Sequence, residues 1–326
     1  MKSLTYKAFG EPADVLQLTE TPMPELTAGQ VLVRMRLAPI HNHDLWTVKG
    51  EYGYKPPLPA IGGSEAVGVI EQVGEGVQLN IGQRVLAAGV TGAWSEYFTI
   101  PAAAIIPVPD SIPDALAAQL IAMPLSTLML LDTLTLKTDE WLIQNAANGA
   151  VGKTLALIAK SRGLQTINLV RRTDAIAELQ ALGIEHVIST EQADWQAQVK
   201  TITQGQLITH AMDSISGQAA RDLLDLLSKG GVFISFGAAE QKAILVTPSD
   251  LIFRQLTLKG FWASAVGQQL ESSKRIAMVQ ELMRLASQGQ LPLPVDGIYP
   301  LADIQGALTA HSSKQRKGKV LLAGAN

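Results

Sequence analysis

The N-terminal third of the chain consists of short apolar segments separated by glycine and proline. Residues 31–37 and 66–73 are apolar over the length of a strand, and the segments 74–76 and 80–83 contain the glycines typical of turns. Apolar, β-branched runs bounded by such residues predict strands joined by tight turns. We therefore expect a small, mostly β domain here.

From residue 141 onward the pattern changes to alternating strands and helices. The predicted strands are 141–146, 165–171, 186–190, 208–213 and 232–237. Helical periodicity lies between them, for example at 173–182 and 217–228, and a longer helix is predicted over about 268–287. Such alternation favours a parallel sheet with right-handed crossovers. A last strand-like segment, 318–322, is expected to return to the first domain.

Composition narrows the class of protein. A length of 326 residues with 47% apolar and 17% charged residues predicts about two folded domains. The net charge of -3 is spread without a basic block, which argues against nucleic acid as a partner. The apolar stretch 115–131 is interrupted by polar residues and proline, so it predicts a buried helix rather than a membrane span.

The absence of cysteine removes several kinds of chemistry. With no cysteine in the sequence, disulfides, a thiolate nucleophile and a cysteine zinc site are excluded. The first residues also lack the apolar core of a signal peptide. We expect a cytoplasmic protein.

The strongest chemical signal lies at 141–152. An apolar strand leads into a turn of small residues, and a helix over 153–162 follows at once. Free N–H groups at a helix N-terminus favour a pyrophosphate, and small residues let the backbone approach it. The segment departs from G-x-G-x-x-G because Ala146 replaces the first glycine. The alternative is that this turn and helix start serve only the packing of helix on strand.

Two arginines occupy the position at which dinucleotide-binding enzymes usually discriminate NAD from NADP. The predicted strand 165–171 ends in Arg171-Arg172, about 20 residues beyond the turn, where NAD enzymes carry a carboxylate for the ribose. Guanidinium groups instead suit a 2′-phosphate. The pair predicts NADPH as cofactor, with an ordinary solvated basic loop as the alternative.

Several further segments make the chain recognisable. They are Ala38-Pro39-Ile40, 44–53, 59–65, 144–152, 166–171, 249–253 and 256–262, the last ending in Gly260-Phe261-Trp262. With these segments the chain resembles the medium-chain dehydrogenase/reductase superfamily. Within it, the chain is most similar to the mitochondrial-type trans-2-enoyl thioester reductases and next to the zinc-free quinone oxidoreductases.

The resemblance implies an α/β fold with two domains. A GroES-like catalytic domain would comprise 1–115 and 286–326, and a Rossmann NADPH-binding domain would comprise 116–285. It also implies a homodimer formed by edge pairing of the Rossmann sheets, and a small-molecule substrate.

The zinc members of the superfamily hold their catalytic metal with a Cys, a His that precedes a Glu, and a further Cys. His41, Ser64 and the region of Met123 occupy these positions here. His41, His43, Asp44 and Glu65 are the only weak substitutes, and zinc requires three or four convergent ligands. We expect no metal site.

Without zinc, an alkene conjugated to a carbonyl is easier to reduce than a carbonyl, because the charge moves onto the oxygen as an enolate and a proton donor completes the reaction. Tyr52 lies in the loop Gly50-Glu51-Tyr52-Gly53 and matches the tyrosine that the thioester reductases use as that donor. The alternative is a half-buried loop aromatic, and neighbouring Tyr54 could be confused with it.

The resemblance also implies the cofactor contacts. The pyrophosphate turn corresponds to Asn148, Gly149, Ala150 and Val151, and the 2′-phosphate site to Arg171 and Arg172. Residues near the nicotinamide are Phe236, Gly237, Ala238, Phe261 and Trp262. Lys319 matches a late lysine that reaches the cofactor, with simple exposure as the alternative.

Two departures from the family lie on the substrate side. His41 replaces the asparagine beside the nicotinamide, and Met123 replaces a polar residue before the cleft proline. We therefore keep three hypotheses. The first is an NADPH-dependent 2-enoyl thioester reductase with Tyr52 as proton donor. The second is an NADPH:quinone oxidoreductase or enone reductase. The third is a non-catalytic NADPH-binding protein.

Overall fold

Strand pairing between distant parts of the sequence divides the chain into two units in a computed structural model that describes residues 1–324. Unit 1 contains Met1–Ala122 and the chain from Leu293 onward, and unit 2 contains Met123–Pro292. The division falls several residues after each boundary expected from the sequence.

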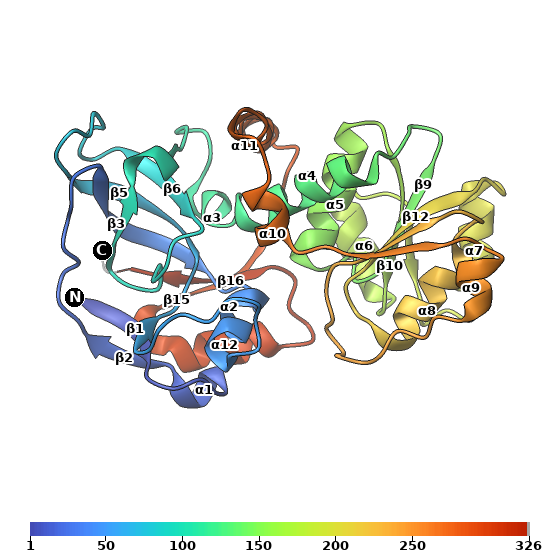
Figure 1. Cartoon of the computed structure of the whole chain (residues 1–326), viewed down its shortest axis with the longest axis horizontal. Helices are drawn as coiled ribbons and strands as arrows, with labels where there is room; N and C mark the ends of the chain where they lie inside the picture. The colour runs from blue at the N-terminus through green and yellow to red at the C-terminus, as the bar shows by residue number, and fades with distance from the viewer. Residues whose placement is uncertain (325–326) are drawn as a thin grey trace. The chain divides into compact units, whose positions relative to one another are not determined.

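Unit 1 is built on two mostly antiparallel sheets (Figure 1). The larger has the strand order β15-β16-β3-β5-β6-β8, with β7 also paired to β3. The smaller has the order β2-β1-β4. The strands are β1 (Lys2–Tyr6), β2 (Gln17–Glu20), β3 (Gln30–Pro39), β4 (Ala60–Ile61), β5 (Glu65–Val73), β6 (Arg84–Ala88), β7 (Tyr97–Pro101), β8 (Ile106–Pro107), β15 (Val295–Pro300) and β16 (Lys319–Ala323).

The C-terminal strand returns to the N-terminal domain, as the sequence predicted. Strand β16 pairs antiparallel with β3, placing Leu321 opposite Pro39. The helices of this unit are α1 (Pro12–Val15), α2 (Asn42–Lys49), α3 (Asp114–Ala117) and α12 (Ile304–Ser312). The short α2 follows directly on the end of β3, so the C-terminal strand supports the segment that carries the candidate proton donor.

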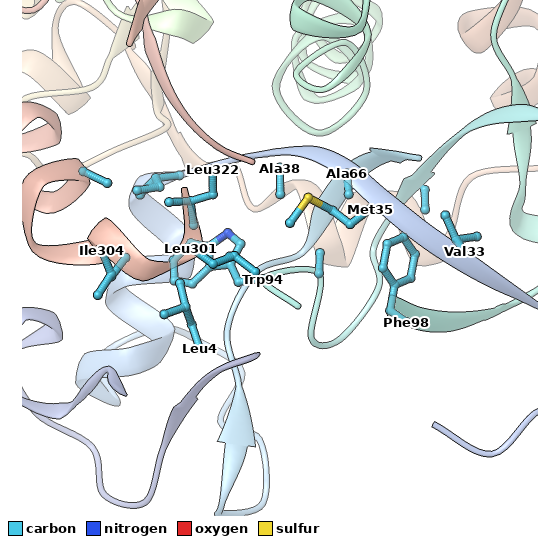
Figure 2. Close-up of a cluster of buried hydrophobic side chains, with 14 of the residues drawn as sticks. Leu4, Val33, Met35, Ala38, Ala66, Trp94, Phe98, Leu301, Ile304 and Leu322 are labelled. Atoms are coloured by element: carbon cyan, nitrogen blue, oxygen red, sulfur yellow. The ribbon is translucent and has the colours of Figure 1, made fainter. Parts of the chain in front are cut away.

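The core of unit 1 is organised around Trp94. Figure 2 shows Leu4, Leu301 and Leu322 gathered around its ring, and the indole Nε1 donates to the carbonyl oxygen of Pro39 at 3.1 Å. The chain passes so close to the ring at Gly63 that a Cβ there would lie 2.4 Å from Trp94 Cδ1. The segment before Ser64 and Glu65 is therefore fixed against the core.

Unit 2 is a six-stranded parallel sheet of order β11-β10-β9-β12-β13-β14 with helices between the strands (Figure 1). Its strands are β9 (Trp141–Gln144), β10 (Gln165–Val170), β11 (Val187–Ser189), β12 (Ile208–Asp213), β13 (Val232–Ser235) and β14 (Thr257–Gly260). Its helices are α4 (Ala122–Leu134), α5 (Ala150–Ser161), α6 (Asp174–Ala181), α7 (Trp195–Thr203), α8 (Gly217–Leu226), α9 (Pro248–Ile252), α10 (Ala263–Gln268) and α11 (Ser272–Ser287).

The α/β fold with a Rossmann-type sheet is confirmed, with differences at the ends of elements. The strand expected over 141–146 stops at Gln144, because Ala146 has φ +48° and turns the chain. The helix expected from 268 begins at Ser272, since a separate helix, α10, ends at Gln268. No helix within residues 1–324 is long and apolar enough to cross a membrane.

We expect Gly63→Ala to destabilise unit 1 more than Gly29→Ala does. Both glycines have positive φ (+88° and +75°), so left-handed backbone alone costs each variant about 1–2 kcal/mol. Only at Gly63 does the added methyl meet Trp94, and such overpacking adds about 1–3 kcal/mol. Urea unfolding of both variants measures the difference. Equal losses would show that the contact with Trp94 does not constrain this segment.

Candidate functional site

A buried polar group follows the end of β3 in unit 1. His41 is 0% exposed, and its Nε2 lies 2.8 Å from Glu65 Oε2. The backbone N–H of His41 donates to Asp44 Oδ2 at 3.1 Å, which caps the first turn of α2. Among the described residues, His41 Nδ1 has no hydrogen-bond partner. His41 thus joins the start of α2 to the start of β5.

Glu65 is the fully buried partner in this pair. Its Oε1 accepts hydrogen bonds from the backbone N–H groups of Ile121 (2.7 Å) and Ala122 (2.9 Å). Burial raises the pKa of Glu65 to about 8, while these two donors and the charge of Lys319 act in the opposite direction. Burial also holds the pKa of His41 well below its usual value. Both shifts favour the uncharged forms of the two side chains in this contact.

Lys319 belongs to the same buried group. Its Nζ donates to the carbonyl oxygen of Ile40 at 3.3 Å, and burial together with the charge of Arg316 lowers its pKa to about 8. The alternative that Lys319 is simply exposed is wrong, because β16 carries it into the interior of unit 1. Its role as a cofactor contact stays a prediction.

The candidate proton donor lies just beyond α2. Gly50 ends the helix with φ +76°, and the N–H of Tyr52 donates to the Trp46 carbonyl at 3.2 Å. The centroid of the Tyr52 ring lies 5.7 Å from that of His43. Tyr54 is 50% exposed. The structure therefore distinguishes the two tyrosines: Tyr52 is the one that adjoins the polar group.

His43 connects Tyr52 to this group. Its Nε2 lies 2.8 Å from Ser64 Oγ and 3.4 Å from Asp44 Oδ1. Its ring stacks on that of His41 with centroids 4.9 Å apart. Residues from the first turn of α2 and from the segment before β5 thus meet beside the phenol.

The donor set of this group does not fit zinc. The Nε2 atoms of His41 and His43 are engaged by Glu65 and Ser64 respectively. Over residues 1–324, no three His, Cys, Asp or Glu side chains converge as metal ligands. A buried imidazole and its carboxylate occupy the place in the sequence where the zinc members carry their ligands.

The turn between β9 and α5 in unit 2 has the geometry expected of a dinucleotide site. The N–H of Gly149 donates to the Ala146 carbonyl at 2.8 Å, and Gly149 is the N-cap of α5. At Gly152 a Cβ would lie 2.6 Å from Ala147 Cα, so only glycine lets the helix pack this closely. Asn148 is half-buried in the turn, and Ala150 and Val151 begin the helix.

A hydrogen-bond network below this turn was not predicted. Asn145 Nδ2 donates to Asp213 Oδ1 at 2.6 Å, and its Oδ1 accepts from the N–H of Ser214 at 2.8 Å. Asp213 also accepts from the N–H groups of Ile215 and Ser216. The network holds the ends of β9 and β12 together. Its only signal in the sequence is a polar residue at the end of each strand.

The two arginines after β10 make different contacts. Arg172 Nη1 lies 2.6 Å from Asp174 Oδ2, while Nη2 lies 3.9 Å from Glu178 Oε2 and has no hydrogen-bond partner among the described residues. Arg171 is exposed, and no described residue accepts a hydrogen bond from its guanidinium. Arg171 is thus the more accessible guanidinium of the pair.

The aromatic residues expected near a nicotinamide come together at the ends of β13 and β14. The rings of Phe236 and Phe261 stack with centroids 5.6 Å apart. The N–H of Gly237 donates to the Asp213 carbonyl at 3.2 Å, which ties the segment containing Ala238 to the network at β12. Trp262 is exposed beside Phe261.

Comparison with known proteins agrees with this division of the chain. Residues 27–110 match the family "Alcohol dehydrogenase GroES-like domain", and residues 150–285 match the family "Zinc-binding dehydrogenase". The human mitochondrial enoyl-[acyl-carrier-protein] reductase is 34% identical over 330 residues, which cover 97% of this chain and 88% of that protein.

Solved structures are similar over the whole chain. A protein from Bacillus thuringiensis described as an NADPH:quinone reductase superposes with a TM-score of 0.92 at 31% identity, covering 99% of both chains. Escherichia coli quinone oxidoreductase, solved with NADPH, superposes with a TM-score of 0.88 at 26% identity, covering 99% of this chain and 100% of that one. The chain therefore belongs to the medium-chain dehydrogenase/reductase superfamily and is an oxidoreductase related to enoyl reductases and quinone oxidoreductases.

Proposed function

We propose that this protein is an NADPH-dependent, zinc-independent reductase of α,β-unsaturated (2-enoyl) thioesters. The observation that carries the proposal is the position of Tyr52, beside His43 and Ser64 in a polar group whose donor set does not fit a metal. The enoyl reductase relatives support the substrate class.

The residues of unit 2 fit a dinucleotide. The free N–H groups at the start of α5 favour the pyrophosphate, and Gly152 lets this helix pack closely on the turn. Exposed Arg171 would take the 2′-phosphate, and Gly237, Phe261 and Trp262 would lie along the nicotinamide end. When bound, NADPH supplies the hydride that reaches the β-carbon of the substrate.

Tyr52 supplies the proton. A phenol holds its proton at neutral pH and gives it up to a carbanionic centre, here the α-carbon of the enolate. The hydrogen bond from the Tyr52 N–H to the Trp46 carbonyl holds the backbone of this turn in place, which supports a donor positioned before substrate arrives.

Reduction of a quinone or simple enone is the second candidate. It is favoured by His41 and Met123, which differ from the enoyl reductase pattern, and by the quinone reductases among the similar structures. A quinone acquires its protons on oxygen and needs no fixed side-chain acid. A non-catalytic NADPH-binding role is the third candidate, which turnover of any of these substrates would exclude.

We expect Tyr52→Phe to lower kcat with a medium-chain trans-2-enoyl-CoA by about 10²–10⁴-fold, because the proton to the α-carbon loses its donor. NADPH oxidation followed at 340 nm measures it, with a simple quinone as the second acceptor. Tyr54→Phe is the matched control and should retain activity, since Tyr54 is 50% exposed. If only the quinone is reduced and the Tyr52→Phe variant is as active as wild type, the thioester proposal is wrong.

We expect Arg171→Ala to raise the KM for NADPH by about 10–100-fold, since a hydrogen bond to a charged group contributes about 1.5–3 kcal/mol. The KM for NADH should stay the same, because NADH has no 2′-phosphate. Arg172→Ala is the matched control and should have the smaller effect, as Asp174 already engages Arg172 at 2.6 Å. The reverse order would assign the 2′-phosphate to Arg172.

We also propose a homodimer formed through β14. Within the described chain β14 pairs only with β13, and the neighbouring α9 segment exposes Leu251, Ile252 and Phe253. Exposed apolar side chains beside an open sheet edge favour association.

Phe253→Asp should convert the dimer to monomers in sedimentation velocity runs, because Phe253 is 71% exposed and a carboxylate there would be desolvated on pairing. Ile81→Asp, at a 67% exposed position in unit 1, is the control and should leave the mass unchanged. A wild type that sediments as a monomer would refute the dimer.

A further inference from the structure

His43 lies next to Tyr52 and has no role in the reaction proposed above. Its ring lies 5.7 Å from the Tyr52 ring, centroid to centroid, and its Nε2 contacts Ser64 Oγ at 2.8 Å. The side chain is 22% exposed, so it also reaches solvent. An imidazole that adjoins a phenol and is partly exposed to water is placed to carry protons between them.

The other histidines of unit 1 cannot take this role. Burial holds His41 neutral with its pKa well below the usual value, aided by the charge of Lys319, and its Nε2 is engaged by Glu65. Burial, Arg316 and Lys319 lower the pKa of His311 to about 3. Both imidazoles therefore stay uncharged at neutral pH and hold no spare proton.

The charged and titratable groups that face His43 come from four segments. Asp44 of α2 lies 3.4 Å from its Nε2, Ser64 holds the same atom from the segment before β5, His41 stacks on one face, and Tyr52 lies across from it. Asp44 is the carboxylate in contact with His43, and burial holds the stacked His41 uncharged. His43 is thus held by hydrogen-bonding groups next to the Tyr52 ring.

We propose that His43 is a proton-relay residue that acts through Tyr52. The inference rests on the proposed function. Once hydride has reached the β-carbon, the Tyr52 O–H bond breaks and its proton forms the new C–H bond at the α-carbon, leaving a phenolate. His43 then gives a proton to the phenolate oxygen, directly or through one water. Solvent reprotonates His43, so each turnover consumes one proton from water.

The test compares wild type, His43→Gln and the control His186→Asn, all as the full chain, with NADPH and a medium-chain trans-2-enoyl-CoA. His186 is a half-buried histidine of unit 2 that packs on Trp141. We expect His43→Gln to lower kcat by about 10-fold or more with the KM for NADPH unchanged, and His186→Asn to match wild type.

Two readouts separate a relay from a merely structural role. The pH dependence of kcat should differ between wild type and His43→Gln, because the variant has no imidazole to take part in proton transfer. The solvent deuterium isotope effect should grow in His43→Gln while the effect of deuterated NADPH shrinks, since proton supply becomes limiting. A kcat within twofold of wild type, or a lower kcat with the same pH profile and isotope effects, would overturn the relay.

Ser64→Ala keeps the inference testable if His43→Gln does not fold. It removes only the hydroxyl that holds Nε2, so we expect the same changes in pH profile and isotope effects at smaller size. Unchanged profiles would overturn the relay. Failure of the proposed function looks different: the thioester is then not reduced, or Tyr52→Phe keeps full activity. If Tyr52→Phe loses activity while His43→Gln behaves like wild type, the relay is refuted and the proposed function stands.

Discussion

The site in unit 1 depends on the hydrogen bonds of the buried Glu65 carboxyl group. A fully buried carboxyl group must have its hydrogen bonds satisfied, because leaving one unmade costs about 1–3 kcal/mol or more. Glu65 meets this requirement through His41, which follows β3, and through the N–H groups of Ile121 and Ala122. The position of His41 then sets the start of α2, and with it His43 and Tyr52. One buried group thus fixes segments from three separate parts of the sequence.

The same group explains how the fold persists without the metal ligands of its zinc-using relatives. A metal would join the segment after β3 to the segment before β5 by coordination. Here an imidazole with a lowered pKa and a carboxyl group with a raised pKa join them by a hydrogen bond of 2.8 Å. A pair that is nearly neutral avoids most of the desolvation penalty of a buried ion pair. The sheet of unit 1 is therefore held at this point by a weakly charged contact.

The sequence predicted the parts of this protein that depend on local patterns. Strand and helix alternation gave the Rossmann sheet, and small residues at 146–152 indicated the turn before α5. The short helix α10 was not predicted, and the helix expected from about 268 begins at Ser272. The bonds of Asn145 to Asp213 and of His41 to Glu65 join residues 68 and 24 positions apart, and no local pattern encodes such pairs. Arg171 and Arg172 look alike in sequence, and the structure distinguishes them by exposure and by the contacts of Arg172 with Asp174 and Glu178.

Two unfavourable features lie in the segments assigned to function, one in each unit. Ala146 adopts a left-handed backbone with φ +48°, which costs a non-glycine residue about 1–2 kcal/mol. His41 Nδ1 is buried without a partner among the described residues, a loss of about 1–3 kcal/mol. Local rules are broken where function constrains the chain. Ala146 turns the backbone so that Gly149 begins α5, and His41 keeps its ring where it supports His43. The sites therefore retain strain that the packed cores around Trp94 and the parallel sheet can offset.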